Sequence, residues 1–239
     1  MHAAPPCNPP CYKGSACLTF ETIGLNNESM NTDKPTARRG RPPRINREHG
    51  DTREALLRAG MEILTEQGFA ATGIDTVLKR IQVPKGSFYH YFDSKEAFGQ
   101  QVLERYAAYF ARKLDRWLLD QDEAPLQRLR NFVEDAKAGM ARHQFRRGCL
   151  VGNLGQEVVV LPDSFRWQLE QVLLDWQQRL VRCLNEAVEA GEIAPGTDCN
   201  ALAAYFWIGW EGAVLRARLV QGIHPLDVFI QGFLTGIER

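Results

Sequence analysis

The chain has 239 residues, of which 44% are hydrophobic and 24% are charged, and its formal net charge at pH 7 is zero. These proportions are typical of a globular protein that is large enough to bury a core. The sequence contains no uninterrupted apolar stretch of about 18 residues, so we expect no transmembrane helix. The start of the chain lacks a basic segment followed by an apolar run, so we expect no secretory leader.

The six cysteines form no CxxC pair, and the histidines are not spaced as zinc ligands. We therefore expect a reduced, cytoplasmic protein that holds neither a metal ion nor another cofactor. The sequence contains no evident pairing of a nucleophile with a base and no phosphate-binding loop, which argues against an enzyme.

The first 50 residues divide into two segments of different composition. Residues 1–36 are rich in Pro, Asn, Gly and Ser and have no helical or strand period, so we expect a disordered leader. Residues 37–50 begin with ARRGRPPRINR, which holds five arginines and no acidic residue. A basic arm of this kind binds phosphate or enters a groove of DNA, although composition alone favours a solubilising tail equally.

A helix is predicted from about Thr52 to Gly68, because apolar residues recur there at steps of three and four. Asp51 or Thr52 is the expected cap at its start, and Gly68 is its expected end. A second short helix is expected to open at Thr72 or Gly73 and to end in a tight turn.

Pro84 suits the first position of a third short helix, residues 84–91, because its missing N–H would have no partner there in any case. Ser94 is the expected cap of a long fourth helix. The helices expected from this point to the C-terminus are residues 94–120, 125–143, 153–160, 163–190, 198–221 and 225–237. Since the alternation typical of strands is absent, the sequence predicts an all-α fold.

Two short helices joined by a tight turn and braced by a longer helix form a helix-turn-helix, whose second helix enters the major groove of DNA. The first residues of that helix, Lys85, Gly86 and Ser87, are therefore expected to face base edges. Lys85 can reach a guanine or a phosphate, Gly86 lets the backbone approach closely, and Ser87 can donate or accept a hydrogen bond.

The aromatic run that follows has two kinds of residue. Tyr89 and Tyr91 end in hydroxyls that suit phosphate oxygens, and Lys95 starts the fourth helix, where the helix dipole favours a phosphate. Phe88 and Phe92 are interpreted as core residues that hold the helix on its scaffold. Taken alone, the run FYHYF is equally compatible with an aromatic strip of the core.

The segment GFAATGIDTVLKRIQVPKGSFYHYFDSKEAFG closely resembles the N-terminal domain of TetR-family transcriptional regulators. The resemblance implies an all-α homodimer with an N-terminal three-helix helix-turn-helix domain and a larger helical ligand-binding and dimerisation domain. Their expected bounds are residues 51–111 and 112–239. The DNA contacts expected in the first domain are those of Thr72, Lys85, Gly86, Ser87, Tyr89, Tyr91 and Lys95.

Beside a helix-turn-helix, the basic arm is better explained as a DNA contact than as a tail. Arg39 and Arg41 belong to an R-G-R-P sequence, and arginines of this kind prefer the narrow minor groove of A·T tracts. The expected partners are double-stranded operator DNA, a second copy of the chain and a small-molecule effector. We expect no contact with a membrane.

Two segments of the C-terminal domain resemble subgroups of the same family. RRGCLVGNLGQE, from Arg146, and FWIGWEGA, from Phe206, are similar to acrylate-responsive repressors. The Gly-Cys-Leu step at 148–150 is also similar to repressors of N-ethylmaleimide reductase, which sense electrophiles through a thiol. The first likeness implies a small unsaturated acid as the effector, and the second implies a reactive Cys149.

An unsaturated acid needs donors for its carboxylate, and Arg146, Arg147 and Asn153 are the candidates. Trp207 and Trp210 are candidate apolar walls, although tryptophans on such a helix are more often core or dimer contacts.

Cys149 follows two arginines and precedes an expected helix, which is an environment that lowers the pKa of a thiol. A cysteine beside Leu and Val is also often a small core residue. Glu211 lies in an apolar helix and needs a partner, which Arg216 or another arginine can supply.

The sequence thus predicts a dimeric, ligand-responsive repressor that binds a palindromic operator and is released by a small unsaturated acid such as acrylate. Thiol-based electrophile sensing through Cys149 is the alternative. A DNA-binding architectural protein without a ligand is disfavoured by the large aromatic C-terminal region. A ligand near Cys149 is expected to move the helix at 94–120 and so change the spacing of the two recognition helices.

Overall fold

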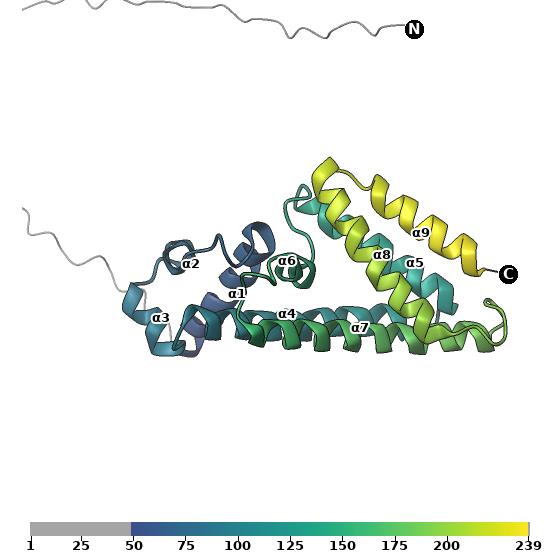
Figure 1. The fold of residues 1–239 in the computed structure, drawn as a ribbon, viewed down its shortest axis with the longest axis horizontal. Coiled ribbons are helices and arrows are strands. Elements are labelled where there is room, and N and C mark those ends of the chain that lie inside the picture. Colours follow the sequence, from purple (N-terminus) through teal and green to yellow (C-terminus); the bar gives the residue numbers. More distant parts are fainter. Residues whose placement is uncertain (1–48, 239) are drawn as a thin grey trace, which may run out of the picture. The chain divides into compact units, whose positions relative to one another are not determined.

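The computed structural model describes residues 49–238, with side chains from Thr52 onward. Over this range the chain is helical and contains no strand, apart from one isolated bridge between Ile193 and Glu238. The helices are α1 (His49–Gln67), α2 (Ile74–Ile81), α3 (Lys85–Tyr91), α4 (Lys95–Leu118), α5 (Pro125–Arg142), α6 (Leu150–Gln156), α7 (Asp163–Glu189), α8 (Cys199–Val220) and α9 (His224–Ile237). The expected all-α fold is confirmed (Figure 1). Arg39 and Arg41 of the predicted arm lie outside the described residues.

Two helix ends follow the local chemistry predicted for them. Gly68 ends α1 with a φ of +82°, a left-handed conformation that costs glycine little, and its N–H donates to the Leu64 carbonyl at 3.0 Å. Ser94 caps α4, because its Oγ accepts a hydrogen bond from the Ala97 N–H at 3.0 Å. The long helix α4 therefore begins at a fixed point next to the short helices.

The predicted start of α1 is wrong by about three residues and that of α3 by one. Helix α1 begins at His49, so Asp51 and Thr52 lie inside it and do not cap it. Pro84 precedes α3 in an extended conformation, with φ −65° and ψ 154°, and is not its first helical residue. The proline ring fixes φ at a value that suits both the N-cap and the first helical position, so only ψ distinguishes these two positions.

Helix α6 also begins earlier than predicted, at Leu150 and not at residue 153. Cys149 is its N-cap, because the Sγ atom accepts a hydrogen bond from the Gly152 N–H at 3.4 Å. The weak sulfur acceptor takes the place that a hydroxyl or carboxylate usually occupies, and sequence patterns for helix starts do not include it.

Helix α4 connects the N-terminal helices α1–α3 with the helices that follow it. It packs on α1 near its start, runs beside α7, and contacts α5 and α6 (Figure 1). Helices α2 and α3 pack near α1 at one end, whereas α8 packs on both α7 and α9. One continuous set of buried apolar side chains extends from α1 to α9. A displacement of α4 is therefore transmitted to α1 through direct packing.

Within residues 49–238, no helix combines the length and the apolar character that a membrane span requires. The same residues include no group of three or more His, Cys, Asp or Glu side chains arranged to hold a metal ion.

Candidate DNA-contacting helix and effector cavity

Helix α3 presents the side chains that a DNA-reading helix needs. Lys85, Gly86 and Tyr89 are exposed, and Ser87 is half-buried. A Cβ built at Gly86 would have no other atom within 4 Å, so this stretch of backbone faces open space. Lys85 lies 3.6 Å from Asp75, an exposed pair that water screens and that DNA can replace at little cost.

The aromatic residues that alternate with these are buried, as predicted. Phe88 is fully buried and Phe92 is 2% exposed. The two rings contact each other, and both contact Phe98 of α4 at centroid distances of 5.0–5.3 Å. Edge-on and tilted contacts of this kind fix the ring positions, so α3 is held rigidly against α4.

The structure contradicts the DNA contact expected for Thr72. Its side chain is 2% exposed, and its hydroxyl donates to the Gly68 carbonyl at 2.6 Å. The hydroxyl therefore stabilises the turn between α1 and α2 and is not available to a phosphate.

Lys95 is the first residue of α4 and is partly buried. Its ammonium lies 4.3 Å from the centre of the Phe69 ring. Burial lowers the pKa of Lys95, and the Glu157 carboxylate opposes that shift. The lysine thus lies between the turn that follows α1 and the end of α6.

A cavity of about 680 Å³ opens among α1, α4, α5, α8 and the loop before α6. Its volume suits a small organic molecule. Four of the predicted sensing residues line it, namely Arg147, Cys149, Trp210 and Glu211. The other three, Arg146, Asn153 and Trp207, do not.

Two of the three predicted carboxylate donors are engaged with α1. Arg147 donates through Nε to Glu66 at 2.8 Å and also pairs with Glu62 at 3.3 Å, so it links the loop to α1. Asn153 donates to the Thr65 carbonyl at 2.7 Å. Arg146 is exposed and lies outside the cavity lining. Arg146 and Asn153 therefore lie outside the cavity lining, and Arg147 lines the cavity with its guanidinium already paired to two acids of α1.

The predicted low pKa of Cys149 is wrong. The thiol is buried, and burial together with the nearby Glu211 raises its pKa well above the usual value. Neither neighbouring arginine offsets this, since Arg147 is paired with acids on α1 and Arg146 is exposed. The pKa of Tyr106, from α4, is also raised by burial and by its neighbours Cys149 and Glu211.

Glu211 lacks the arginine partner that its position in an apolar helix suggests. Among the described residues no ion pair includes it, and its Oε1 atom is buried without a hydrogen-bond partner. Arg216 is exposed. Burial raises the pKa of Glu211 to about 7, whereas a hydrogen bond with Cys149 acts in the opposite direction. Near neutral pH, this carboxyl group is therefore present in both protonation states.

The two tryptophans have different surroundings. Trp207 is 4% exposed and packs against Phe110, Phe132 and Trp176, so it is a core residue. Trp210 is 3% exposed and lines the cavity. Trp210 therefore lies at the cavity, where a role as an apolar wall stays a prediction, whereas Trp207 does not line the cavity.

Three residues that link the helices were not predicted from the sequence. Tyr106 reaches Cys149 and Glu211 from α4. The Glu157 carboxylate accepts hydrogen bonds from the Phe69 N–H at 3.0 Å and the Ala70 N–H at 2.8 Å. Arg218 of α8 donates to Asn153, and also to the Glu66 and Arg146 carbonyls. No local pattern marks them, because their partners are 43 to 152 residues away in sequence.

The fold and the exposed face of α3 define a helix-turn-helix protein with a helical domain that contains a cavity. Residues 56–102 match the family model for bacterial regulatory proteins of the tetR family, and residues 125–233 match a tetracyclin repressor-like C-terminal domain.

Individual relatives agree with these matches. The chain is 51% identical over 210 residues to the transcriptional regulator AcuR of Cereibacter sphaeroides, covering 84% of this chain and 94% of that protein. It is 33% identical over 181 residues to the transcriptional repressor NemR of Escherichia coli K12, covering 74% of this chain and 89% of that protein. A crystal structure of a regulatory protein TetR from Rhodobacter sphaeroides has 53% identity and a TM-score of 0.76, covering 77% of this chain and 97% of that one. The chain belongs to the TetR family of transcriptional regulators, and it is a DNA-binding regulator and not an enzyme.

Proposed function

We propose that this regulator is a dimeric repressor that leaves a palindromic operator when a small unsaturated carboxylic acid such as acrylate occupies the cavity. Residues 51–111 serve as the DNA-binding domain and residues 112–239 as the effector and dimerisation domain. The observation that carries the proposal is the cavity itself, which lies between α1 of the first domain and α8 of the second. The likeness to the two named regulators supports the class of function.

The proposed DNA contacts follow from the exposed face of α3. Lys85, Gly86 and Ser87 face base edges, and the following tyrosines and Lys95 contact the phosphates on either side. The burial of Phe88 supports this orientation, because it fixes which face of the helix remains free.

Dimerisation is proposed through α8 and α9. Tyr205, Ile208 and Leu219 of α8 are 61–76% exposed, and Val228 of α9 is 56% exposed. Exposed large apolar side chains on these two helices favour a protein interface there, and homodimers are typical of the family. A second copy of the chain on this face would place two α3 helices at a fixed separation, as a palindromic operator requires.

Effector binding is proposed to reach DNA through the contacts of α6 and its preceding loop with α1. Arg147 and Asn153 bind α1, and Glu157 binds the turn that follows it. A ligand that favours one arrangement of α4, α6 and α8 shifts the population of that arrangement and so the spacing of the recognition helices.

Electrophile sensing through Cys149 is the second candidate, because this thiol lines the cavity. Its raised pKa leaves little thiolate at neutral pH, which slows addition to an electrophile. Reversible binding is therefore the better-supported mode.

The effector proposal is tested by titrating acrylate into a complex of the protein with a duplex that the wild type selects from random DNA. We expect acrylate to release the DNA, measured by fluorescence anisotropy, and dialysis to restore binding. The response is expected to persist in Cys149→Ser, because a serine hydroxyl keeps the helix cap but is a poor nucleophile. If acrylate released DNA from the wild type but not from Cys149→Ser, the thiol mechanism would be favoured.

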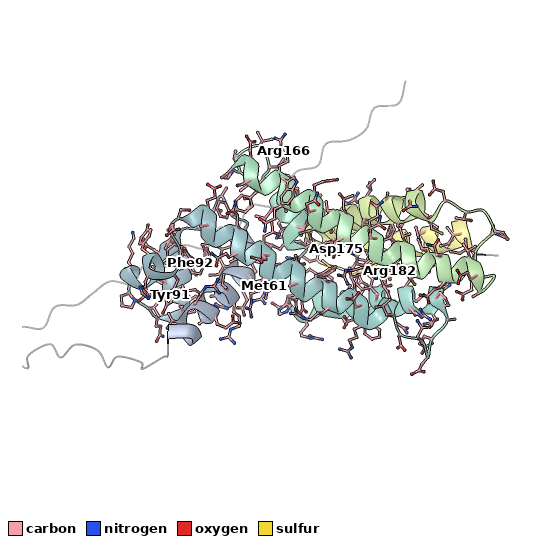
Figure 2. All side chains as sticks on the ribbon, turned by 90° about the horizontal axis from the view of Figure 1, so that it is seen from below. Met61, Tyr91, Phe92, Arg166, Asp175 and Arg182 are labelled. Atoms are coloured by element: carbon pink, nitrogen blue, oxygen red, sulfur yellow. The ribbon has the colours of Figure 1, made fainter. Side chains whose placement is uncertain are left out.

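Lys95→Ala is expected to weaken binding to every duplex alike, because a phosphate contact carries no sequence information. The slope of log K against log salt concentration should become shallower by about 1. Arg182→Ala removes the same charge from an exposed site on α7, far from Tyr91 and Phe92 (Figure 2). An equal change of slope in both variants would argue against a phosphate contact of Lys95.

A further inference from the structure

The inner end of the cavity combines a carboxyl group with two weakly polar neighbours. Glu211 of α8 meets Cys149, the cap of α6, and Tyr106 of α4. Glu211 also approaches Gly152 so closely that a Cβ there would collide with its Oε2 atom. Within residues 52–238, its buried Oε1 atom has no hydrogen-bond partner. Because Glu211 also lines the cavity, a molecule bound there is placed to supply that partner.

A carboxylate ligand needs a donor at this end, and the cations of the cavity do not supply one. Lys113 is paired with Asp135 at 2.8 Å, and Arg147 is paired with two acids of α1. The remaining arginines that line the cavity are exposed, namely Arg112, Arg116 and Arg142.

We propose that Glu211 binds the carboxylate of the effector in its own protonated form, so that each anion enters the cavity together with one proton. The inference rests on the proposed function, because it takes the effector to be a small monocarboxylate bound in this cavity. The Glu211 O–H donates to a carboxylate oxygen of the ligand, while Trp210 covers the apolar part of the molecule.

The physical reason is the repulsion between two carboxylates that share one site. Two such groups at hydrogen-bond distance hold one proton between them, because both cannot be ionised without a large cost. Burial already raises the pKa of free Glu211 to about 7, so the proton is partly in place before the ligand arrives. Tyr106 and Cys149 stay neutral at this pH, because the pKa of each is raised.

The sign of the pH dependence follows directly. Above the pKa of free Glu211, the carboxyl group must take up a proton before it can bind the anion, so the apparent Kd rises with pH. Acrylate itself stays ionised over this range, because carboxylic acids of this kind ionise near pH 4. His143, which follows α5, also lines the cavity, and an imidazole that bound the anion in its protonated form would give a dependence of the same sign. A test must therefore separate the two residues.

The experiment is isothermal titration of the full-length protein with acrylate at several values from about pH 6 to about pH 8. We expect the Kd to rise about tenfold across this range, with uptake of close to one proton above neutral pH in buffers of different ionisation enthalpy. In Glu211→Gln the amide can still donate to the ligand but cannot titrate, so binding should become independent of pH. Acrylamide, the uncharged amide of the same acid, should bind the wild type without this dependence.

His143→Gln is the matched control, and it should keep the pH dependence of the wild type. A flat profile in this variant, or an unchanged profile in Glu211→Gln, would overturn the inference. Wild-type binding that does not vary with pH would overturn the inference and leave the proposed effector intact. Failure of acrylate to bind at any pH would reject the proposed effector class and the inference together.

Discussion

Phe88→Ala is expected to abolish specific DNA binding, because it removes the side chain that fixes α3. The ring is fully buried and contacts Phe92 and Phe98. Truncation of a buried phenylalanine costs about 3–5 kcal/mol of the free energy of unfolding. Chemical denaturation and anisotropy titration with the selected duplex measure the two effects.

Tyr89→Phe is the control for this variant, since it changes the next residue on the exposed side of the helix. Tyr89 is 52% exposed, and only its hydroxyl is removed. The free energy of unfolding should stay within about 0.5 kcal/mol of the wild type, while DNA affinity falls modestly. DNA binding of Phe88→Ala that equals the wild type would show that α3 does not depend on this packing.

Gly68→Ala is expected to be the second most damaging change, because it disturbs the turn between α1 and α2 in two ways. The φ of +82° costs an alanine about 1–2 kcal/mol. The added Cβ would also overlap the Glu157 carboxylate, which must then leave the Phe69 and Ala70 N–H groups at a further cost of about 1–3 kcal/mol.

A double-mutant cycle separates the two contributions. In a Glu157→Ala background the collision is gone, so Gly68→Ala should cost only the backbone strain of about 1–2 kcal/mol. The unfolding free energies of the four proteins give the coupling. If the losses of unfolding free energy in the two single variants added up exactly in the double variant, the hydrogen bonds of the Glu157 carboxylate would not depend on the glycine at position 68.

The helices were predictable because their signals are local. Gly68, Ser94 and the apolar periods each act within a few residues, so the C-terminal end of α1 and the start of α4 were assigned correctly. The errors arose where a signal is ambiguous or unusual. Pro84 fits two adjacent positions, and Cys149 caps α6 with a sulfur atom that helix-start patterns do not include.

The candidate effector site was only partly predictable, because its chemistry depends on contacts between distant residues. The pattern around Cys149 indicated a cation-rich loop, but Arg147 is neutralised by acids of α1, about 80 residues earlier. Glu211 was recognised as unusual in an apolar helix, and an arginine partner was the natural expectation. Its actual neighbour is a thiol, and nothing in the sequence around either residue brings them together.

The contacts of α6 with α1 matter to anyone who would build a biosensor by exchanging domains within the family. A junction at residue 111 would separate Asn153 and Glu157 from the Thr65, Phe69 and Ala70 groups that they bind. Arg218, near the end of α8, would lose the Glu66 carbonyl in the same cut. We therefore expect a chimera made at this proposed boundary to lose the connection between its two parts, unless the last turn of α1 and the turn after it travel with the C-terminal part.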